Sequence, residues 1–300
     1  MIGRIFAVVN PAAGGGRGGQ NAQRILERIR AAGLAIEVAQ TRAPGEASAL
    51  AREAFERGFR RFLSMGGDGT AFEVINGLFP YQESQGRPEL ALLPLGTGNS
   101  FLKDFGYCGP EQTIEDLLDG RTQRCDVIRL THSQGEFYFI NLLTLGFAAD
   151  VADVVNRRFK WLGQAGYVLG VLVCVARLEP QFFPLRTDDS RDLDRKPCLF
   201  LAFSNTRYTG GKMLIAPDAD PRDGLIEYVR WGPIGRFGLL RNLPRLFDGT
   251  HIRRPQASRR AVRRVEFEMD APVNVTLDGE SMRLQCRSIE VLPAALDIVA

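Results

Sequence analysis

Three short glycine-bearing segments carry the residue types that could do chemistry. They are Asn10–Gly16, Gly66–Thr70 and Pro94–Ser100, and each follows an apolar run of the length of a buried strand. Glycines let backbone N–H groups approach an anion closely, and the N-terminus of a following helix favours negative charge. We therefore predict a phosphate-binding site built from the three segments. Asp68 in the second segment indicates chemistry at that phosphate.

The second segment, Gly66–Thr70, gives the strongest signal. One interpretation is a plain strand-to-helix turn with Thr70 as the helix cap, but two glycines before Asp68 and one after it exceed what a turn requires. A carboxylate among phosphate-binding amides is repelled unless it binds Mg²⁺ or takes up a proton. We therefore favour a role for Asp68 in the reaction over a purely structural one.

The elements that must position these segments alternate between strand and helix in the first part of the chain. Such alternation predicts a parallel sheet covered by helices. In a sheet of this kind the carboxyl ends of the strands face one crevice, so the three segments would meet there. The predicted strands cover 4–9, 34–38, 61–65 and 90–93, and the predicted helices cover 20–32, 47–57, a stretch from about Thr70 to Pro80, and 111–118.

From about residue 124 the pattern changes to short β-rich runs separated by turn residues such as Asp278-Gly279. This predicts a mainly antiparallel domain over 125–300 after an α/β nucleotide-binding domain over 1–124, with the last residues returning to the first domain. A helical insertion is expected around 151–177. Its most apolar part, Gly166–Ala176, is too short to span a bilayer and favours a buried helix or strand, with the wall of an acyl-chain pocket as the alternative.

The composition narrows the class of function. Lys and Arg number 38 against 35 Asp and Glu, so the net charge of +3 does not indicate nucleic-acid binding. Only two histidines are present, which disfavours a zinc site and a histidine-based triad. We find no signal peptide and expect a cytoplasmic protein. Six arginines gather between Arg253 and Arg264, which fits either an anionic membrane surface or a solvated edge. They are Arg253, Arg254, Arg259, Arg260, Arg263 and Arg264.

The motifs resemble the signature loops of the diacylglycerol kinase catalytic-domain family, which includes the sphingosine and ceramide kinases and the bacterial YegS/BmrU-type lipid kinases. The resemblance begins at Asn10-Pro-x-x-Gly, Gly66-Gly-Asp-Gly-Thr and Pro94-Leu-Gly-Thr-Gly-Asn. Further matching residues extend it over nearly the whole chain. They are Asn205, Gly210-Gly211, Pro217-Asp-Ala, Asp223-Gly224 and Leu277-Asp-Gly-Glu.

The resemblance implies a fold and a set of site residues. The first domain would resemble NAD kinase and 6-phosphofructokinase, the second would be a β-sandwich, and the active site would lie in the cleft between them. Glu280, or Asp68 as in sphingosine kinases, would accept the proton of the substrate hydroxyl. A structural Mg²⁺ would be held by Asp223 and by backbone oxygens of Asp220 and Leu225, although the sequence alone also fits a plain polar turn there. The residues implied to contact ATP are Asn10, Pro11, Ala12, Ala13, Gly14, Thr41, Gly66, Gly67, Asp68, Gly69, Thr70, Ala71, Phe72, Gly96, Thr97, Gly98 and Asn99.

One departure from the family pattern concerns the lipid. Ala148 stands where many bacterial members have Asp, and the block Gly146–Val151 is closer to that of sphingosine kinases. Those enzymes carry a further acidic residue at the position of Ala152, whereas here Asp153 follows one residue later. The acceptor therefore stays open among diacylglycerol, phosphatidylglycerol, ceramide and a sphingoid base.

The resemblance favours an ATP- and Mg²⁺-dependent kinase of a lipid hydroxyl, with diacylglycerol as the first choice of acceptor. A NAD-kinase-like enzyme and a non-catalytic lipid- or nucleotide-binding protein are the alternatives. The expected partner is a lipid at a membrane surface, at the inner leaflet, reached through peripheral association. The oligomeric state stays open, with a homodimer as one option.

Overall fold

The protein folds into two compact units. The computed structural model describes residues 3–16, 18–95, 100–159, 164–188, 190–210 and 212–300. Unit 1 comprises Met1–Val127 together with Pro293–Ala300, and unit 2 comprises Ile128–Leu292. The units therefore divide after Val127, whereas the sequence places the domain boundary after residue 124.

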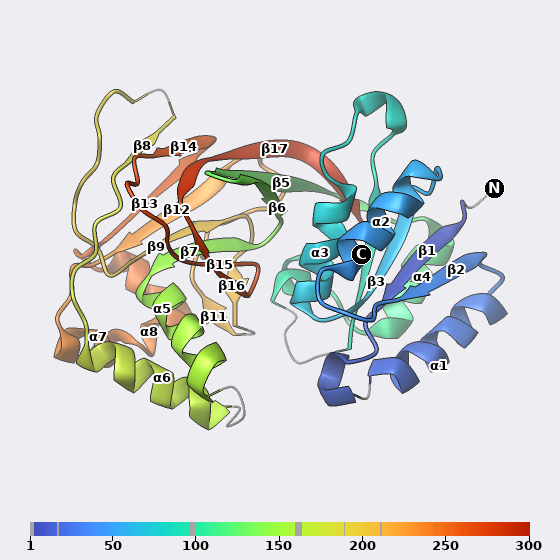
Figure 1. Ribbon diagram of the computed structural model, residues 1–300, viewed down its shortest axis with the longest axis horizontal. Coiled ribbons are helices and arrows are strands. Elements are labelled where there is room, and N and C mark those ends of the chain that lie inside the picture. Colours follow the sequence, from blue (N-terminus) through green and yellow to red (C-terminus); the bar gives the residue numbers. More distant parts are fainter. Residues whose placement is uncertain (1–2, 17, 96–99, 160–163, 189, 211) are drawn as a thin grey trace. The chain divides into compact units, whose positions relative to one another are not determined.

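Unit 1 is built on a parallel sheet with the strand order β2-β1-β3-β4 (Figure 1). The end of β17 adds a fifth parallel strand, because Asp297 and Ile298 pair with Glu89 and Leu90. The strands are β1 (Ile5–Val9), β2 (Ile36–Gln40), β3 (Arg61–Gly66), β4 (Glu89–Pro94) and β17 (Cys286–Ile298). The helices are η1 (Ala13–Gly16), α1 (Gly18–Ala31), α2 (Glu46–Glu56), α3 (Asp68–Leu78), η2 (Glu83–Gln85), η3 (Phe101–Phe105) and α4 (Pro110–Asp119).

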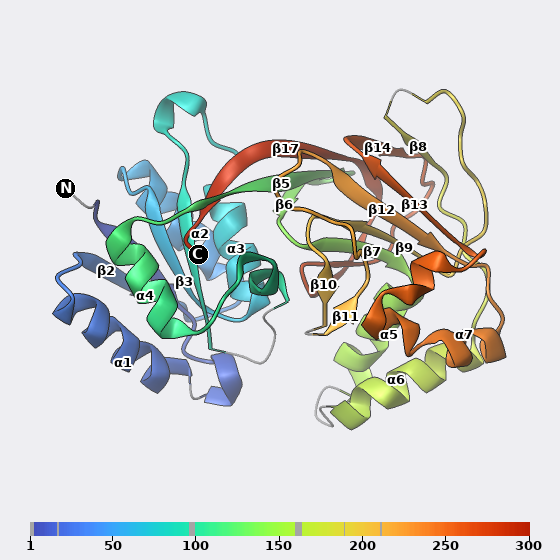
Figure 2. The ribbon, with the colours of Figure 1, turned by 180° about the vertical axis from the view of Figure 1, so that it is seen from behind.

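Helices cover both faces of the unit 1 sheet, as the full burial of β1 and β3 requires. On one face, Leu26 and Ile29 of α1 share a hydrophobic core with Leu117 of α4. On the other face, α2 and α3 pack together, and Phe55 of α2 lies 6.3 Å from Phe62 of β3 between ring centroids. Figures 1 and 2 show these two helical layers from opposite sides. The predicted α/β architecture is confirmed for this unit.

Unit 2 contains a six-stranded antiparallel sheet with the order β13-β12-β9-β7-β15-β16. A second layer of strands packs against it, because Phe203 of β9 meets Phe267 of β14, which belongs to another sheet, at 5.5 Å between ring centroids. The predicted antiparallel β-sandwich is confirmed. The first sheet contains β7 (Leu142–Gly146), β9 (Phe200–Ser204), β12 (Ile226–Trp231), β13 (Ala257–Val262), β15 (Val273–Leu277) and β16 (Glu280–Leu284). The other strands are β5 (Gln123–His132), β6 (Gly135–Phe139), β8 (Leu185–Thr187), β10 (Tyr208–Thr209), β11 (Met213–Leu214) and β14 (Arg264–Phe267).

Helices cover the opposite face of the six-stranded sheet. Val175, Leu239 and Leu246, from three different helices, share one hydrophobic core with Trp231. The predicted helical insertion forms α5 and α6, but Gly166–Ala176 is not fully buried, because Leu169 and Leu172 are exposed. The elements are α5 (Phe147–Val154), a π-helical turn η4 (Val155–Phe159), α6 (Gln164–Ala176), α7 (Arg236–Asn242), α8 (Arg245–Asp248) and η6 (Thr250–Arg253).

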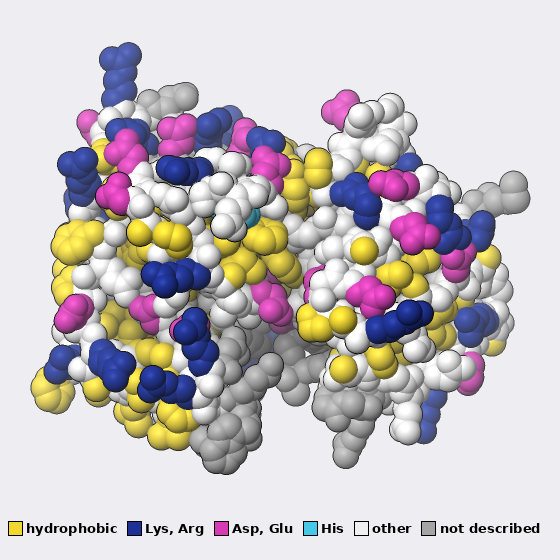
Figure 3. Space-filling model, in the orientation of Figure 1, with side chains coloured by type: hydrophobic (Ala, Val, Ile, Leu, Met, Phe, Trp, Pro, Cys, Tyr) yellow, Lys and Arg dark blue, Asp and Glu magenta, His cyan; other side chains and the backbone are white. Residues whose placement is uncertain are grey.

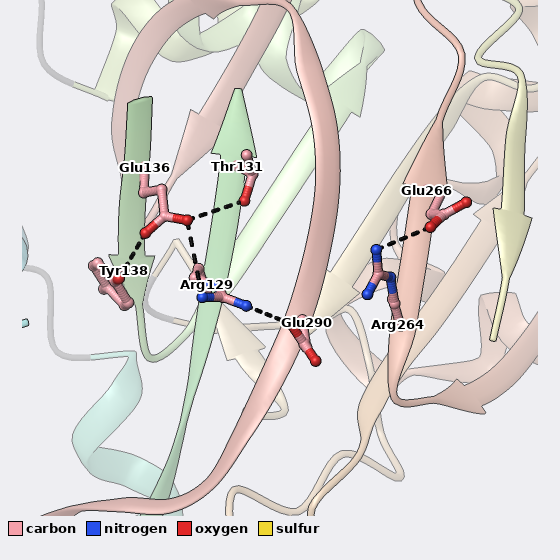
Figure 4. Close-up of polar contacts among 7 residues, drawn as sticks. All are labelled: Arg129, Thr131, Glu136, Tyr138, Arg264, Glu266 and Glu290. Atoms are coloured by element: carbon pink, nitrogen blue, oxygen red, sulfur yellow. Dashed lines mark hydrogen bonds and ion pairs between the residues drawn. The ribbon is translucent and has the colours of Figure 1, made fainter. Parts of the chain in front are cut away.

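An ion-paired cluster ties three neighbouring strands of unit 2 together (Figure 4). Arg129 of β5 donates to Glu290 of β17 at 2.6 Å and lies 3.9 Å from Glu136 of β6. Glu136 also accepts from the hydroxyl of Tyr138 at 2.8 Å. Burial, and then this hydrogen bond, raise the pKa of Tyr138 to about 12, so the hydroxyl stays a donor. Each of these groups is satisfied by a neighbour, so we assign the cluster a structural role.

Candidate active site

The described parts of the predicted glycine segments of unit 1 lie at one edge of its sheet, at the carboxyl ends of the strands. They follow β1, β3 and β4, which are neighbours in the parallel order. Asn10 N–H donates to the carbonyl of Met65 at 2.9 Å, and Leu95 N–H donates to the carbonyl of Gly66 at 2.8 Å. Thr41, just after β2, donates its N–H to Val9 at 2.9 Å and so lies at the same edge.

Asn10 and Thr70 join the first two segments through their side chains. Asn10 Nδ2 donates to Thr70 Oγ1 at 3.1 Å, while Asn10 Oδ1 accepts from the N–H of Ala12 at 3.0 Å. Thr70 is buried, and its side chain leaves no room for a side chain on Gly66. A Cβ added to Gly66 would lie 2.3 Å from Thr70 Oγ1. Both side chains therefore shape the loops, whatever those loops bind.

Gly14 and Gly67 have different physical reasons to be glycine. Gly14 has a φ of +61°, and a Cβ there would lie 2.3 Å from the carbonyl oxygen of Leu95. Gly67 has a φ of −100°, and an added Cβ would meet no atom of the described residues within 4 Å. The fold thus requires Gly14, whereas no described residue occupies the space beside Gly67 at the N-terminus of α3.

Asp68 is the first residue of α3 and is half-buried. Its carboxylate therefore belongs to the turn where the helix dipole is positive, a position that favours negative charge. Farther along the same helix, Phe72 is buried, so only its backbone is available to a ligand.

Glu73 is a supporting residue that the sequence analysis missed. Its carboxylate accepts from the N–H groups of Gly45 at 2.7 Å and Ala47 at 3.1 Å, which caps the start of α2. Ser48 Oγ donates to the backbone carbonyl of Glu73 at 2.6 Å. A glutamate five residues after Asp68 is visible in the sequence, but only the packing of α2 against α3 gives it a partner.

Part of the third segment falls outside the described residues. Gly96, Thr97, Gly98 and Asn99 belong to that part, so their predicted contacts with ATP stay predictions. The structure describes the flanking Leu95 and Ser100, and Ser100 is buried.

In unit 2, Glu280 stands at the tip of a tight hairpin between β15 and β16. The turn residues Asp278 and Gly279 have φ of +47° and +94°, as a two-residue type I′ turn requires. Leu277 pairs with Glu280 across the turn, and Glu280 is exposed. The hairpin thus holds the exposed Glu280 at a defined place in unit 2.

Asp278 fixes this hairpin to the rest of unit 2. Its carboxylate accepts from three successive backbone N–H groups at the start of β7: Ile140 at 2.9 Å, Asn141 at 3.0 Å and Leu142 at 2.8 Å. Asp278 is only 6% exposed, so these bonds are shielded from water. Asp278 therefore holds the turn that carries Glu280.

The predicted magnesium ligands lie in a short surface turn. Asp223 is exposed and accepts from the N–H of Leu225 at 2.9 Å, while Asp220 accepts from Arg222 at 3.0 Å. One carboxylate with main-chain oxygens is a donor set that suits Mg²⁺. Within the described part of the chain, however, no group of three or more His, Cys, Asp or Glu is placed to hold a metal ion. The assignment of Asp220, Asp223 and Leu225 therefore stays a prediction.

Comparison with known proteins identifies the family. The profile of the diacylglycerol kinase catalytic domain matches residues 4–130, and that of the YegS C-terminal NAD kinase beta sandwich-like domain matches residues 141–300. The chain belongs to the diacylglycerol kinase catalytic-domain family. It is a lipid kinase, in agreement with its relatives, which are named diacylglycerol kinase or probable lipid kinase.

Two relatives illustrate the similarity. A diacylglycerol kinase of Mycobacterium tuberculosis is 30% identical over 303 residues, which cover 99% of this chain and 95% of the relative. A protein of Chromohalobacter salexigens named a probable lipid kinase YegS-like is 33% identical over 285 residues, which cover 91% of this chain and 86% of the relative.

A solved structure shares the fold of this lipid kinase. The crystal structure of a diacylglycerol kinase from Bacillus anthracis matches with a TM-score of 0.72 at 19% identity, over 99% of this chain and 96% of the other. Among the residues described, no helix of this lipid kinase is both long and apolar enough to cross a bilayer.

In this lipid kinase Asp150, in the block similar to sphingosine kinases, is held by two amides. Gln181 Nε2 donates to it at 2.6 Å and Asn274 Nδ2 at 2.9 Å, which ties α5 to β15. The neighbouring Asp153 pairs with Arg157 at 2.7 Å. Both carboxylates thus have protein partners.

The six arginines between Arg253 and Arg264 do not act alike. Arg259 pairs with the buried Glu227 at 2.8 Å and also with Asp218. Arg264 pairs with Glu266 at 2.9 Å (Figure 4). Two of the six charges are therefore offset locally by carboxylates.

Proposed function

We propose that this lipid kinase transfers the γ-phosphoryl group of ATP to the hydroxyl of diacylglycerol. The observation that carries the proposal is that Asn10 and Leu95, from the first and third segments, are hydrogen-bonded to the end of β3, two to three residues before Asp68. An added Cβ on Gly67 would also meet no described atom within 4 Å. Backbone N–H groups at a helix N-terminus suit the charged oxygens of a triphosphate. The name of the Mycobacterium tuberculosis relative favours diacylglycerol as the acceptor.

The reaction requires one proton acceptor. The lipid hydroxyl oxygen forms a bond to the γ-phosphorus as the bond from that phosphorus to the β–γ bridging oxygen breaks, and ADP leaves with the electron pair. The hydroxyl proton passes to a carboxylate, either Glu280 or Asp68. Mg²⁺, when bound, offsets charge on the β- and γ-oxygens. The loops around Gly67 hold the phosphates by their backbone.

We propose that the reaction takes place on the cytoplasmic side of a membrane, where the enzyme associates peripherally with the inner leaflet. The lipid acceptor resides in that surface. A homodimer is not required by this chemistry.

Labelled ATP tested against diacylglycerol, phosphatidylglycerol, ceramide and sphingoid bases checks the proposal. We expect transfer to diacylglycerol, and a loss of at least about 100-fold in kcat for Asp68→Asn or Glu280→Gln, whichever residue accepts the proton. A matched control is Glu266→Gln, an exposed glutamate of β14 that belongs to neither the glycine segments nor the Glu280 hairpin.

Other outcomes would replace the proposal. Phosphorylation of NAD without lipid phosphorylation would favour a NAD-kinase-like enzyme. Tight lipid binding without transfer to any acceptor would favour a non-catalytic binding protein. Full turnover by both folded carboxylate variants would remove Asp68 and Glu280 from the mechanism.

A further inference from the structure

The large apolar side chains exposed in the described part of the chain all belong to unit 2, and five of the six lie on its helices α6, α7 and α8. Isolated apolar residues on a surface are ordinary, but a group on adjoining helices needs an explanation. Phe237 is the extreme case, with 89% of its surface exposed. The group comprises Leu169, Leu172, Phe182, Phe237, Leu240 and Phe247.

The short helices α7 and α8 are built to point apolar side chains outward. In α7, Leu239 is fully buried while Phe237 and Leu240, three residues apart, are exposed. In α8, Leu246 is buried while the adjacent Phe247 is 57% exposed. One leucine thus anchors each helix in the core, and the outward positions are occupied by residues that burial within this unit does not require.

The longer α6 packs against α7 and repeats the pattern. Its Val175 lies in the core, whereas Leu169 and Leu172, again three residues apart, are exposed. Figure 3 shows hydrophobic side chains interspersed with Lys and Arg over the end of the unit that carries α6 and α7 in Figure 1.

Positive charge accompanies this apolar surface. Residues 232–256 contain five arginines and a single aspartate, Asp248. Four of the arginines line a surface pocket of about 600 Å³: Arg241, Arg245, Arg253 and Arg254. Asp248 is already engaged by Thr250, through the N–H at 2.9 Å and the hydroxyl at 2.6 Å. The Nε of Arg254 is buried and has no hydrogen-bond partner among the described residues, so a bound anion would supply one.

We propose that α7, α8 and η6 form a docking surface for an anionic membrane. Phe237, Leu240 and Phe247 enter the boundary between head groups and acyl chains, and the four arginines of the pocket bind lipid phosphates. The two terms, buried apolar area and attraction to anionic lipid, are those that hold peripheral proteins at a bilayer. The inference rests on the lipid kinase function, since the substrate resides in that bilayer.

The charge pattern favours a membrane over a protein partner. The arginines beside the apolar residues outnumber the one aspartate, Asp248, and form a mainly positive surface, which matches a lipid surface at many positions without a fixed register. The arginines farther along the chain are less suited, because Arg259 and Arg264 are already ion-paired.

Sedimentation with vesicles, in the absence of ATP and diacylglycerol, tests the surface. The vesicles contain phosphatidylcholine with or without phosphatidylglycerol. We expect Phe237→Ser/Phe247→Ser to weaken binding to the anionic vesicles at least about tenfold, since two aromatic side chains no longer enter the bilayer. Arg241→Gln/Arg245→Gln should remove most of the preference for anionic over neutral vesicles, and the remaining binding should depend little on salt concentration.

A matched control removes the same charge elsewhere. Arg260→Gln/Arg263→Gln also loses two exposed arginines, in and just after β13, and should bind as wild type does. All variants should keep the wild-type melting temperature, because the changed side chains lie at the surface.

Three results would overturn the proposal. In the first, the wild-type protein does not bind anionic vesicles. In the second, the phenylalanine and arginine variants both bind as wild type does. In the third, the phenylalanine variant changes from dimer to monomer while its vesicle binding is unchanged. The last result would make the surface an interface between copies of the chain. The vesicle experiment measures binding and not phosphoryl transfer. Its outcome therefore tests the docking surface even if the proposed kinase reaction proves wrong.

Discussion

The two units position their candidate residues by different means. In unit 1 the loops are packed closely at glycines, where no side chain intervenes. The side chain of Thr70 lies against Gly66, and Gly14 lies against the carbonyl of Leu95. In unit 2 a carboxylate fixes the position, because Asp278 accepts hydrogen bonds from three N–H groups and so holds the hairpin of Glu280. Parallel strands deliver their loops to a common edge, so small residues suffice there. An antiparallel hairpin ends in a turn that needs its own anchor.

The largest effect should come from removing the anchor of unit 2. Asp278→Ala leaves three buried N–H groups without an acceptor, so we expect the free energy of unfolding to fall by at least about 3 kcal/mol. Urea unfolding measures this. Glu280→Gln is the control, because Glu280 is exposed and its change should leave the unfolding free energy within about 0.5 kcal/mol of wild type. An Asp278→Ala protein as stable as wild type would show that the turn holds without its carboxylate.

A pair of glycine substitutions should separate folding from binding in unit 1. Gly14→Ala places a Cβ against the Leu95 carbonyl at a positive φ, and should cost about 1–3 kcal/mol of unfolding free energy. Gly67→Ala meets no described atom and should leave stability nearly unchanged.

The two variants should differ again in kinetics. If phosphate oxygens lie beside Gly67, Gly67→Ala should raise the KM for ATP by about tenfold, a change of roughly 1.4 kcal/mol in binding free energy. Steady-state kinetics on the folded variant decides this. An unchanged KM for ATP would place the triphosphate elsewhere.

The smallest effect concerns the exposed turn of unit 2, where Asp223 contrasts with the buried Asp278. Asp223→Ala should change the melting temperature little in the absence of divalent ions, because Asp223 is exposed and its hydrogen bond to Leu225 lies at the surface. If Asp223 holds Mg²⁺, wild type should gain melting temperature on addition of Mg²⁺ without ATP, and the variant should not. A wild-type melting temperature indifferent to Mg²⁺ would contradict the site.

The sequence predicted unit 1 better than unit 2. The strands and helices of unit 1 follow from apolar periodicity, and β1, β3 and β4 lie where the pattern indicates. In unit 2, the sequence of β13 gives no strand signal, because its residues 258–261 are exposed and include two arginines, so apolar and polar residues do not alternate. The helices α7 and α8 were missed because seven and four residues are too short to show a helical period.

The candidate site was predictable only where local pattern decides it. The meeting of the glycine segments follows from parallel topology, and the hydrogen bonds of Asn10 and Leu95 agree with it. The anchors were not predictable, because their partners are distant in sequence. Glu73 caps a helix 28 residues earlier, and Asp278 binds Ile140 at a separation of 138 residues. Which residues bind ATP or Mg²⁺ stays a prediction.

The path of β17 bears on the order in which the protein is made. Unit 1 includes Pro293–Ala300, and the N–H of Val299 donates to Leu90 of β4 at 3.0 Å. A ribosome releases residues 128–292 before this last stretch, so the whole of unit 2 emerges while β4 still has an open edge. The unit synthesised first is therefore completed last, contrary to the usual order in which N-terminal domains finish folding first.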